Sequence, residues 1–279
     1  MKLHSIAFFI MIPFLILVLY TGYHVFFMDD NSMFPYLLVF AIISTIIYLF
    51  SPQIDFAWYS NYPKDFSQKE RTFLSSISTF YNSLEEKDRL KFEQRSYVFI
   101  RSKDFKLIMK ERKEMPEDMK LVVATNAIQV AFHSDNYLYK KYDRYFAYGH
   151  EFPTPDKKFL HSVEVNHDDK IAIFNMDVLV KSLNFENRIF NIGLFAFIDI
   201  FLHINKKSIP DLPETTSVWQ KITDISSISK NDIINTIGYE PSNIINILYT
   251  VFFMYPENSM THFPEQYEVF SSIFKIQNK

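Results

Sequence analysis

Two long apolar runs stand at the start of the chain. Residues 6–28 contain no acidic or basic side chain other than His24, and residues 33–50 form a second run after the polar segment Asp29–Ser32. A helix needs roughly 17–25 apolar residues to cross the hydrocarbon core of a bilayer, and both runs have that length. A cleaved signal peptide is the alternative, but the first run is long and no small-residue cleavage site precedes the second. The pattern predicts a transmembrane hairpin over residues 1–52, with the lipid bilayer as its partner.

Basic residues are unevenly distributed around this hairpin. Lys2 precedes the first run, and Lys64, Lys69 and Arg71 follow the second, whereas the turn between the runs has no basic residue. Cytoplasmic flanks of membrane helices carry an excess of lysine and arginine. The sequence therefore predicts a membrane location with both termini and the C-terminal domain in the cytoplasm.

The remainder of the chain has a mainly helical pattern. Residues 53–67 are rich in aromatic side chains suited to the headgroup region and are interpreted as a juxtamembrane linker. Over residues 68–279, apolar side chains recur mostly at helical spacing, while residues 142–152 and 170–174 have the character of strands. These patterns predict a mainly α (α+β) chain: two N-terminal transmembrane helices, then a mostly helical domain with a small β-sheet.

The most apolar segment of that domain is Asn191–Asn205. It is long enough for about four helical turns and too short to cross a membrane, so it is predicted to be a buried central helix. In a zinc peptidase such a helix carries His-Glu-x-x-His, whose histidines bind the metal one turn apart while the glutamate acts as a base. The residues of this helix therefore bear directly on whether the chain is an enzyme.

Composition excludes several classes of function. The chain has only four glycines, which argues against a glycine-rich phosphate-binding loop. It has no cysteine, so disulfides, cysteine-ligated zinc and thiol catalysis are excluded. The formal net charge of -3 provides no general attraction to nucleic acid, and none is expected as a partner.

Four passages between Leu84 and the C-terminus share their order and spacing with one known family. They are Met115–Ala124, Tyr145–Phe152, Asn191–Leu194, and Val251–Glu257 with the following Phe263–Tyr267. Together they resemble the MtfA (Mlc titration factor A)-like zinc metallopeptidases, especially the membrane-anchored forms. The resemblance implies a zincin-like peptidase-fold domain over residues 68–279, with zinc as the family's cofactor and the bacterial inner membrane as the location.

The resemblance places the family's catalytic positions on residues that lack the required chemistry. The zinc histidines fall on Phe195 and Asp199 and the general-base glutamate on Ala196, so His-Glu-x-x-His is replaced by Phe195-Ala196-Phe197-Ile198-Asp199. The third ligand, a glutamate, falls on Asn243, and a further family glutamate on Thr250. Catalytic zinc needs three protein ligands and a water with a base beside it. The chain is therefore predicted to have no catalytic residues of the family type and no bound zinc.

Three functions remain open. The first is a pseudoenzyme that binds a protein or peptide in the former substrate groove, beside Phe195 and Phe197. The second is a metal-dependent peptidase with a relocated site. Asp199 and His203 lie one turn apart on the same helix face and could share a metal. This alternative requires that a nearby stretch with three further candidates approaches them; these are His161, Glu164 and His167. The third is a structural membrane scaffold whose groove has been filled, which an open polar cleft at Phe195, Ala196 and Asp199 would contradict.

Overall fold

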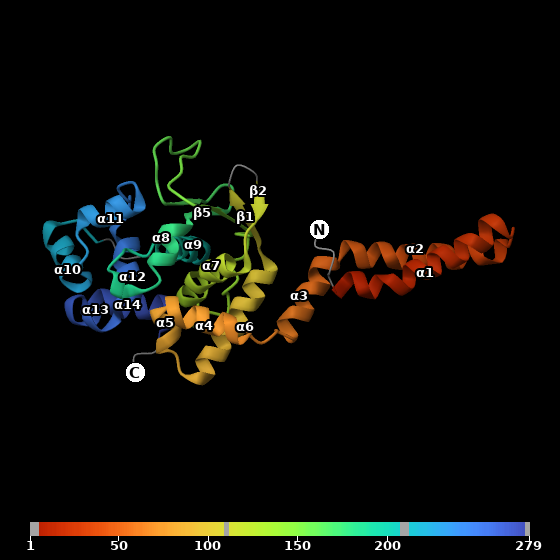
Figure 1. Cartoon of the computed structure of the whole chain (residues 1–279), viewed down its shortest axis with the longest axis horizontal. Helices are drawn as coiled ribbons and strands as arrows, with labels where there is room; N and C mark the ends of the chain where they lie inside the picture. The colour runs from red at the N-terminus through yellow and green to blue at the C-terminus, as the bar shows by residue number, and fades with distance from the viewer. Residues whose placement is uncertain (1–5, 109–111, 207–211, 277–279) are drawn as a thin grey trace. The chain divides into compact units, whose positions relative to one another are not determined.

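The computed structural model describes residues 6–108, 112–206 and 212–276, so Lys2 lies outside the described residues. The chain divides into two compact units, residues 1–64 and residues 65–279 (Figure 1). Each unit has its own internal packing, and each is described separately below.

The first unit is a helical hairpin followed by a third helix. Helices α1 (Ile6–Phe27) and α2 (Phe34–Leu49) lie side by side, joined through the short 3-10 helix η1 (Asn31–Met33) (Figure 1). Their mean hydropathies are 2.2 and 2.0, and most of their side chains are exposed. By length and composition, both helices are able to cross a membrane.

Helix α3 (Ser51–Asn61) occupies most of the segment interpreted as a linker. It contacts α1, and the carboxylate of Asp55 accepts a hydrogen bond from the backbone N–H of Ala7 at 2.9 Å. An acidic group is favourable at that position because the first N–H groups of a helix have no partner within the helix. This contact links the end of the hairpin to its beginning.

The second unit is mostly helical, as the apolar spacing predicts. Its first helix, α4 (Gln68–Ile77), begins at a capping box in which Ser67 and Glu70 bond reciprocally to each other's backbone N–H. The other helices are α5 (Thr79–Ser83), α6 (Glu86–Ser102), α7 (Glu117–Val130), α8 (Met176–Lys181), η2 (Phe185–Asn187), α9 (Ile192–Asn205), α10 (Thr216–Ser226), α11 (Lys230–Ile237), α12 (Ile244–Met254), α13 (Pro256–His262) and α14 (Pro264–Phe274).

The described strands form one mixed sheet in the order β2-β1-β3-β5-β4. The three central strands, β1 (Asp104–Ile108), β3 (Arg144–Tyr148) and β5 (Ile171–Asn175), are parallel, and the edge strands β2 (Arg112–Glu114) and β4 (Val163–Asn166) are antiparallel to their neighbours. Parallel neighbours need a crossover connection, which α7 provides between β1 and β3. The predicted strands at 142–152 and 170–174 are confirmed as β3 and β5.

Helix α9 lies at the centre of the second unit, in contact with α7, α8, α12, β4 and β5 (Figure 1). Phe197 in its middle is fully buried, and its ring packs against four others, those of Phe99, Tyr139, Tyr145 and Phe174. Burying an aromatic side chain of this size contributes roughly 1.5–3 kcal/mol. The buried central helix, the mainly α fold and the small sheet are all confirmed.

Candidate functional site

The start of α9 is fixed by two buried residues. Asn191 accepts a hydrogen bond from the backbone N–H of Leu194 at 2.9 Å and donates one to the carbonyl of Ser182 at 3.2 Å. Gly193 allows α9 to approach its neighbours closely, because an added Cβ would lie 2.4 Å from Cγ of Asn126 and 2.6 Å from Cδ1 of Leu179. Packing against α7 and α8 thus sets the register of α9. That register determines where Phe195, Ala196 and Asp199 lie.

Replacing Gly193 with alanine is expected to destabilise the protein by about 2 kcal/mol. In an open helix the same change would stabilise by up to about 1 kcal/mol, but here the methyl group overpacks the contact with Asn126 and Leu179. Gly149→Ala is the matched control, because no atom lies within 4 Å of its added Cβ. Urea unfolding of the two full-length variants measures the difference, and equal stability of G193A and G149A would contradict it.

Two of the residues on which the sequence resemblance places catalytic positions lie in the hydrophobic core. Phe195 is 6% exposed, with its ring 5.9 Å from that of Phe190, and Ala196 is completely buried. Phe197, expected beside Phe195 in a groove, is also buried, against the aromatic rings described above. None of these three side chains lines an open cleft.

Asp199 instead belongs to a polar group that we call the Asp199 cluster: Tyr142, His167, Asp199, His203 and Asn246. Its carboxylate lies 2.9 Å from Nε2 of His167 and accepts a hydrogen bond from the Asn246 amide at 3.0 Å. Nδ1 of His167 lies 2.5 Å from the hydroxyl of Tyr142. The His203 ring stacks on the His167 ring at 4.1 Å, with 9° between the planes.

Hydrogen-bond chemistry fixes the proton positions in this chain of contacts. A carboxylate only accepts, so Nε2 of His167 donates to Asp199, and Nδ1 can then accept from the Tyr142 hydroxyl. Burial and the nearby carboxylates of Asp199 and Asp168 raise the pKa of Tyr142 to about 12, so its phenol keeps the proton it donates. Burial, followed by the nearby His167 and Lys170, lowers the pKa of His203.

The two remaining residues that the resemblance assigns to the site bond to the backbone of α12. Asn243 caps this helix and accepts a hydrogen bond from the backbone N–H of Ile245 at 2.8 Å. Thr250 is buried and donates to the carbonyl of Asn246 at 2.7 Å. Of the α12 side chains, Asn246 is the one bonded to Asp199, and it was not among the sequence candidates.

The relocated-site candidates separate into two groups. His167 and His203 do meet Asp199, as the second interpretation requires. His161 and Glu164 are buried and pair with each other, Nε2 to Oε2 at 3.0 Å, and Thr154 donates to the same carboxylate oxygen at 2.7 Å. Within the described part of the chain, no group of three or more His, Asp or Glu side chains is arranged to hold a metal ion.

The residues on which the resemblance places the zinc site do not fit a catalytic zinc. Phe195 and Ala196 have no atom that can bind a metal, which leaves Asp199 as the single metal-binding side chain of these three, whereas a catalytic zinc needs three protein ligands. The lone pairs of His167 and His203 lie in ring planes that are almost parallel, so they do not converge on one point. The arrangement can instead bind polar groups through imidazole, amide, phenol and carboxylate side chains.

One part of the chain matches a known protein family. Residues 58–174 match the family model described as glucose-regulated metallo-peptidase M90. No match was found among curated proteins or among solved structures. The matched segment contains α4 to α7, β1 to β4 and most of β5, and it ends before α9 begins at Ile192. Over residues 58–174 the chain is therefore similar to the MtfA-like, glucose-regulated M90 family of metallopeptidases.

Proposed function

We propose that this chain is a membrane-anchored M90-family protein that acts by binding a protein or peptide rather than by hydrolysing one. The observation that carries the proposal is what the structure does with the residues on which the resemblance places the catalytic positions. Phe195 and Ala196 are part of the core, and Asp199 is paired with His167 and Asn246. Zinc-dependent hydrolysis needs a metal-bound water and a base beside it, and these positions supply neither.

Membrane anchoring is supported by the first unit. Helices α1 and α2 are apolar over their whole length and expose most of their side chains, as lipid-facing helices do. Lys64, Lys69 and Arg71 follow the hairpin, while Asp29 and Asp30 lie in its turn. This charge distribution supports a cytoplasmic second unit.

The Asp199 cluster is the surface on which we place the partner. The side chains of Asp199 and His167 are 31% and 32% exposed, and His203 is exposed beside them. Such partly exposed donors and acceptors can bond to the main chain of a bound segment. The buried aromatic side chains beneath them keep these groups in fixed positions.

Metal content tests the non-catalytic part of the proposal. The full-length chain, expressed with zinc supplied and purified in a neutral detergent, is expected to contain far less than one zinc per chain and to cleave no peptide from a mixed-sequence library. Zinc near one per chain that is lost in both Asp199→Asn and His203→Asn would overturn the proposal. It would favour a peptidase with a metal site at the Asp199 cluster.

A site-specific photo-cross-linker tests the binding part. Placed at position 203 in cells, it is expected to yield a discrete adduct, whose protein component then binds the purified full-length chain. Asp199→Ala should weaken that binding by about tenfold, the loss associated with one charge-assisted hydrogen bond. Lys181, an exposed residue on α8, is the control position. Equal cross-linking from positions 203 and 181 would argue against a partner at the cluster.

A further inference from the structure

Two adjacent apolar side chains are exposed on one loop of the second unit. They are Phe159 and Leu160, which are 50% and 58% exposed, in the loop between β3 and β4. Among the described residues of the second unit, the other exposed large apolar side chains are Leu90 and Met260. Of these, Phe159 and Leu160 are the most exposed and the only two that are adjacent in sequence. Single exposed apolar residues are ordinary on protein surfaces, whereas contiguous ones mark contact sites.

The backbone on the C-terminal side of this pair is held in place. The N–H of Phe152 donates to the carbonyl of His161 at 3.0 Å, and the N–H of His161 donates to the carbonyl of Phe152 at 3.1 Å. Gly238 packs so closely against the loop that an added Cβ would lie 2.4 Å from Cα of His161. The N–H of Ser162 donates to the carbonyl of Ile237 at 2.8 Å. These contacts fix the position of the residue that directly follows Leu160.

Buried polar side chains hold the same loop to the sheet. His161 and Glu164 are 0% and 3% exposed, and Nε2 of His161 lies 3.0 Å from Oε2 of Glu164. Thr154, near the other end of the loop, donates its hydroxyl to that same oxygen at 2.7 Å. The loop thus buries polar groups and exposes Phe159 and Leu160, the reverse of the usual preference of these residue types.

The basic residues before the pair suit a lipid surface. Nζ of Lys157 lies 3.5 Å from Oε2 of Glu164, and the carboxylate of Asp156 accepts a hydrogen bond from the Asn166 amide at 3.0 Å. Lys158, directly before the apolar pair, is exposed. Its aliphatic stem can lie along apolar groups while its ammonium stays in the polar region, where anionic lipids attract it.

A short linker connects the second unit to the apolar hairpin. Residues 62–67 are the whole connection between α3 and α4, and an extended stretch of that length spans at most about 20 Å. Because α1 and α2 are able to cross a bilayer, this linker would keep the second unit close to lipid. A short flexible linker gives an effective concentration in the millimolar range, at which a small apolar contact suffices.

We propose that Phe159 and Leu160 insert into the headgroup region of the bilayer in which the chain is anchored, with Lys158 at the level of the lipid phosphates. The inference rests on the membrane anchoring in the proposed function and does not depend on a partner at the Asp199 cluster. Apolar groups at such interfaces lie about 5–10 Å into the boundary between headgroups and acyl chains. The insertion would give the second unit its own contact with lipid and restrict its orientation on the linker.

Single-cysteine variants that carry an environment-sensitive fluorophore test this contact, because the chain has no cysteine of its own. The full-length chain is labelled at Leu160→Cys and reconstituted in nanodiscs of phosphatidylcholine and phosphatidylglycerol, with and without brominated acyl chains. The emission is expected to shift to shorter wavelength and to be quenched by the brominated lipid. Phe159→Asp in the same labelled chain should remove both effects, because it places a charge where the ring would insert.

Two further labelled positions serve as controls. Met260→Cys on α13 replaces a side chain of similar exposure, 45%, so it measures the affinity of the fluorophore itself for lipid. Leu19→Cys on α1, where the native side chain is 74% exposed, reports on the hairpin and should be quenched.

Three results would overturn the inference. If quenching at position 160 does not exceed that at position 260 while position 19 is quenched, the loop does not touch lipid and the membrane anchoring still stands. If position 19 is not quenched either, the anchoring fails together with the inference. A label at position 160 that shifts to shorter wavelength without being quenched is covered by protein, such as a second copy of the chain, rather than by lipid.

Discussion

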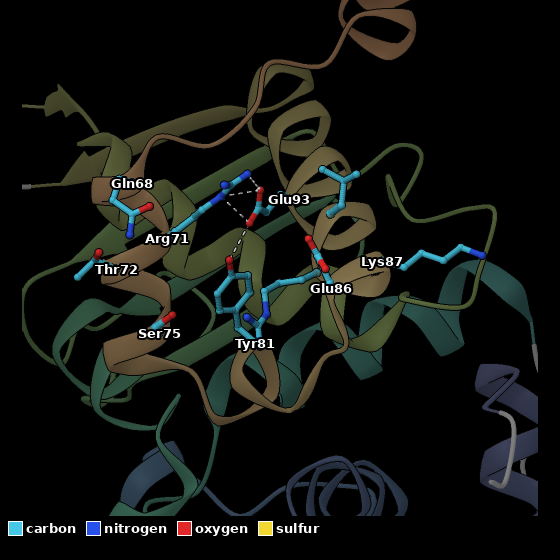
Figure 2. Close-up of a pocket in the computed structure, with 10 residues that line it drawn as sticks. Gln68, Arg71, Thr72, Ser75, Tyr81, Glu86, Lys87 and Glu93 are labelled. Carbon is cyan, nitrogen blue, oxygen red and sulfur yellow. Dashed lines mark hydrogen bonds and ion pairs between the residues drawn. The ribbon is translucent and has the colours of Figure 1, made fainter.

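Replacing Arg71 with methionine is expected to lower the free energy of unfolding of the second unit by more than replacement of an unpaired surface arginine does. Arg71 donates to both carboxylate oxygens of Glu93, from Nε at 3.1 Å and from Nη2 at 2.9 Å (Figure 2). The substitution leaves the buried Glu93 carboxylate with Tyr81 as its remaining side-chain donor. The buried carboxylate then lacks its compensating cation, which destabilises the folded state. Because the Arg71 side chain is 42% exposed, water screens the pair in part, and the loss is smaller than for a fully buried ion pair.

Urea unfolding of the full-length chain, followed by Trp219 fluorescence, measures this loss, because Trp219 is 9% exposed and lies in the second unit. Arg101→Met removes an exposed arginine of α6 and should change stability by less than about 0.5 kcal/mol. The double variant Arg71→Met/Glu93→Met should recover most of the loss, because the uncompensated charge is gone. A double variant that is less stable than R71M would show that packing, rather than charge, accounts for the effect.

Local patterns of apolar residues were sufficient to predict the helices and strands whose own side chains are mostly buried. Asn191–Asn205 forms α9 because nearly all of its side chains are apolar, and the alternation near Tyr145 forms β3. β1 was not predicted, since Asp104–Ile108 is short, half polar, and pairs with β3, which lies far away in the sequence. Pairing over such a distance depends on topology, which a local pattern does not encode.

The same limit of local patterns applies to the Asp199 cluster. Asp199 and His203 could be paired from their spacing on one helix, and His167 was a candidate through its nearby histidine and glutamate. Tyr142 and Asn246 reach the cluster from other parts of the fold and have no local signal. Asn246 is nevertheless a polar residue within the apolar helix Ile244–Met254, and that contrast could have identified it.

The burial of Glu93 beside Arg71 could not be predicted from sequence at all. Arg71 and Glu93 are charged residues on amphipathic helices, where the ordinary expectation is a solvated face. Only the packing of α4, α5 and α6 brings them together and buries Glu93. A sequence reveals that a charged residue is buried only if its partner can be recognised, and here the partner of Glu93 lies on a different helix.

Restoring the family glutamate by Ala196→Glu is expected to destabilise the second unit by about 4 kcal/mol at pH 8 rather than to restore a base. Ala196 is completely buried in α9 and belongs to the hydrophobic core of the second unit. The new side chain must therefore displace core groups and lose its hydration. Burial raises the pKa of a carboxyl group, so in the folded protein this glutamate would be mainly protonated and neutral.

The sign of the pH dependence follows from that raised pKa. Below the unfolded-state pKa of about 4.3, the new carboxyl group is protonated in both the folded and the unfolded state, so the free energy of unfolding falls only through the added volume and the buried neutral polar group. As the pH rises from there toward the folded-state pKa, the unfolded state loses its proton first, and the free energy of unfolding falls further. Ala196→Gln has nearly the same volume and no titrating group, so it should be destabilised to a similar extent at pH 5 and pH 8. The measurement is urea unfolding by Trp219 fluorescence at both pH values. If A196E is as stable as wild type at pH 8 and gains stoichiometric zinc, the pocket for the family's chemistry is still present, and the binding role proposed for this protein would have to be abandoned.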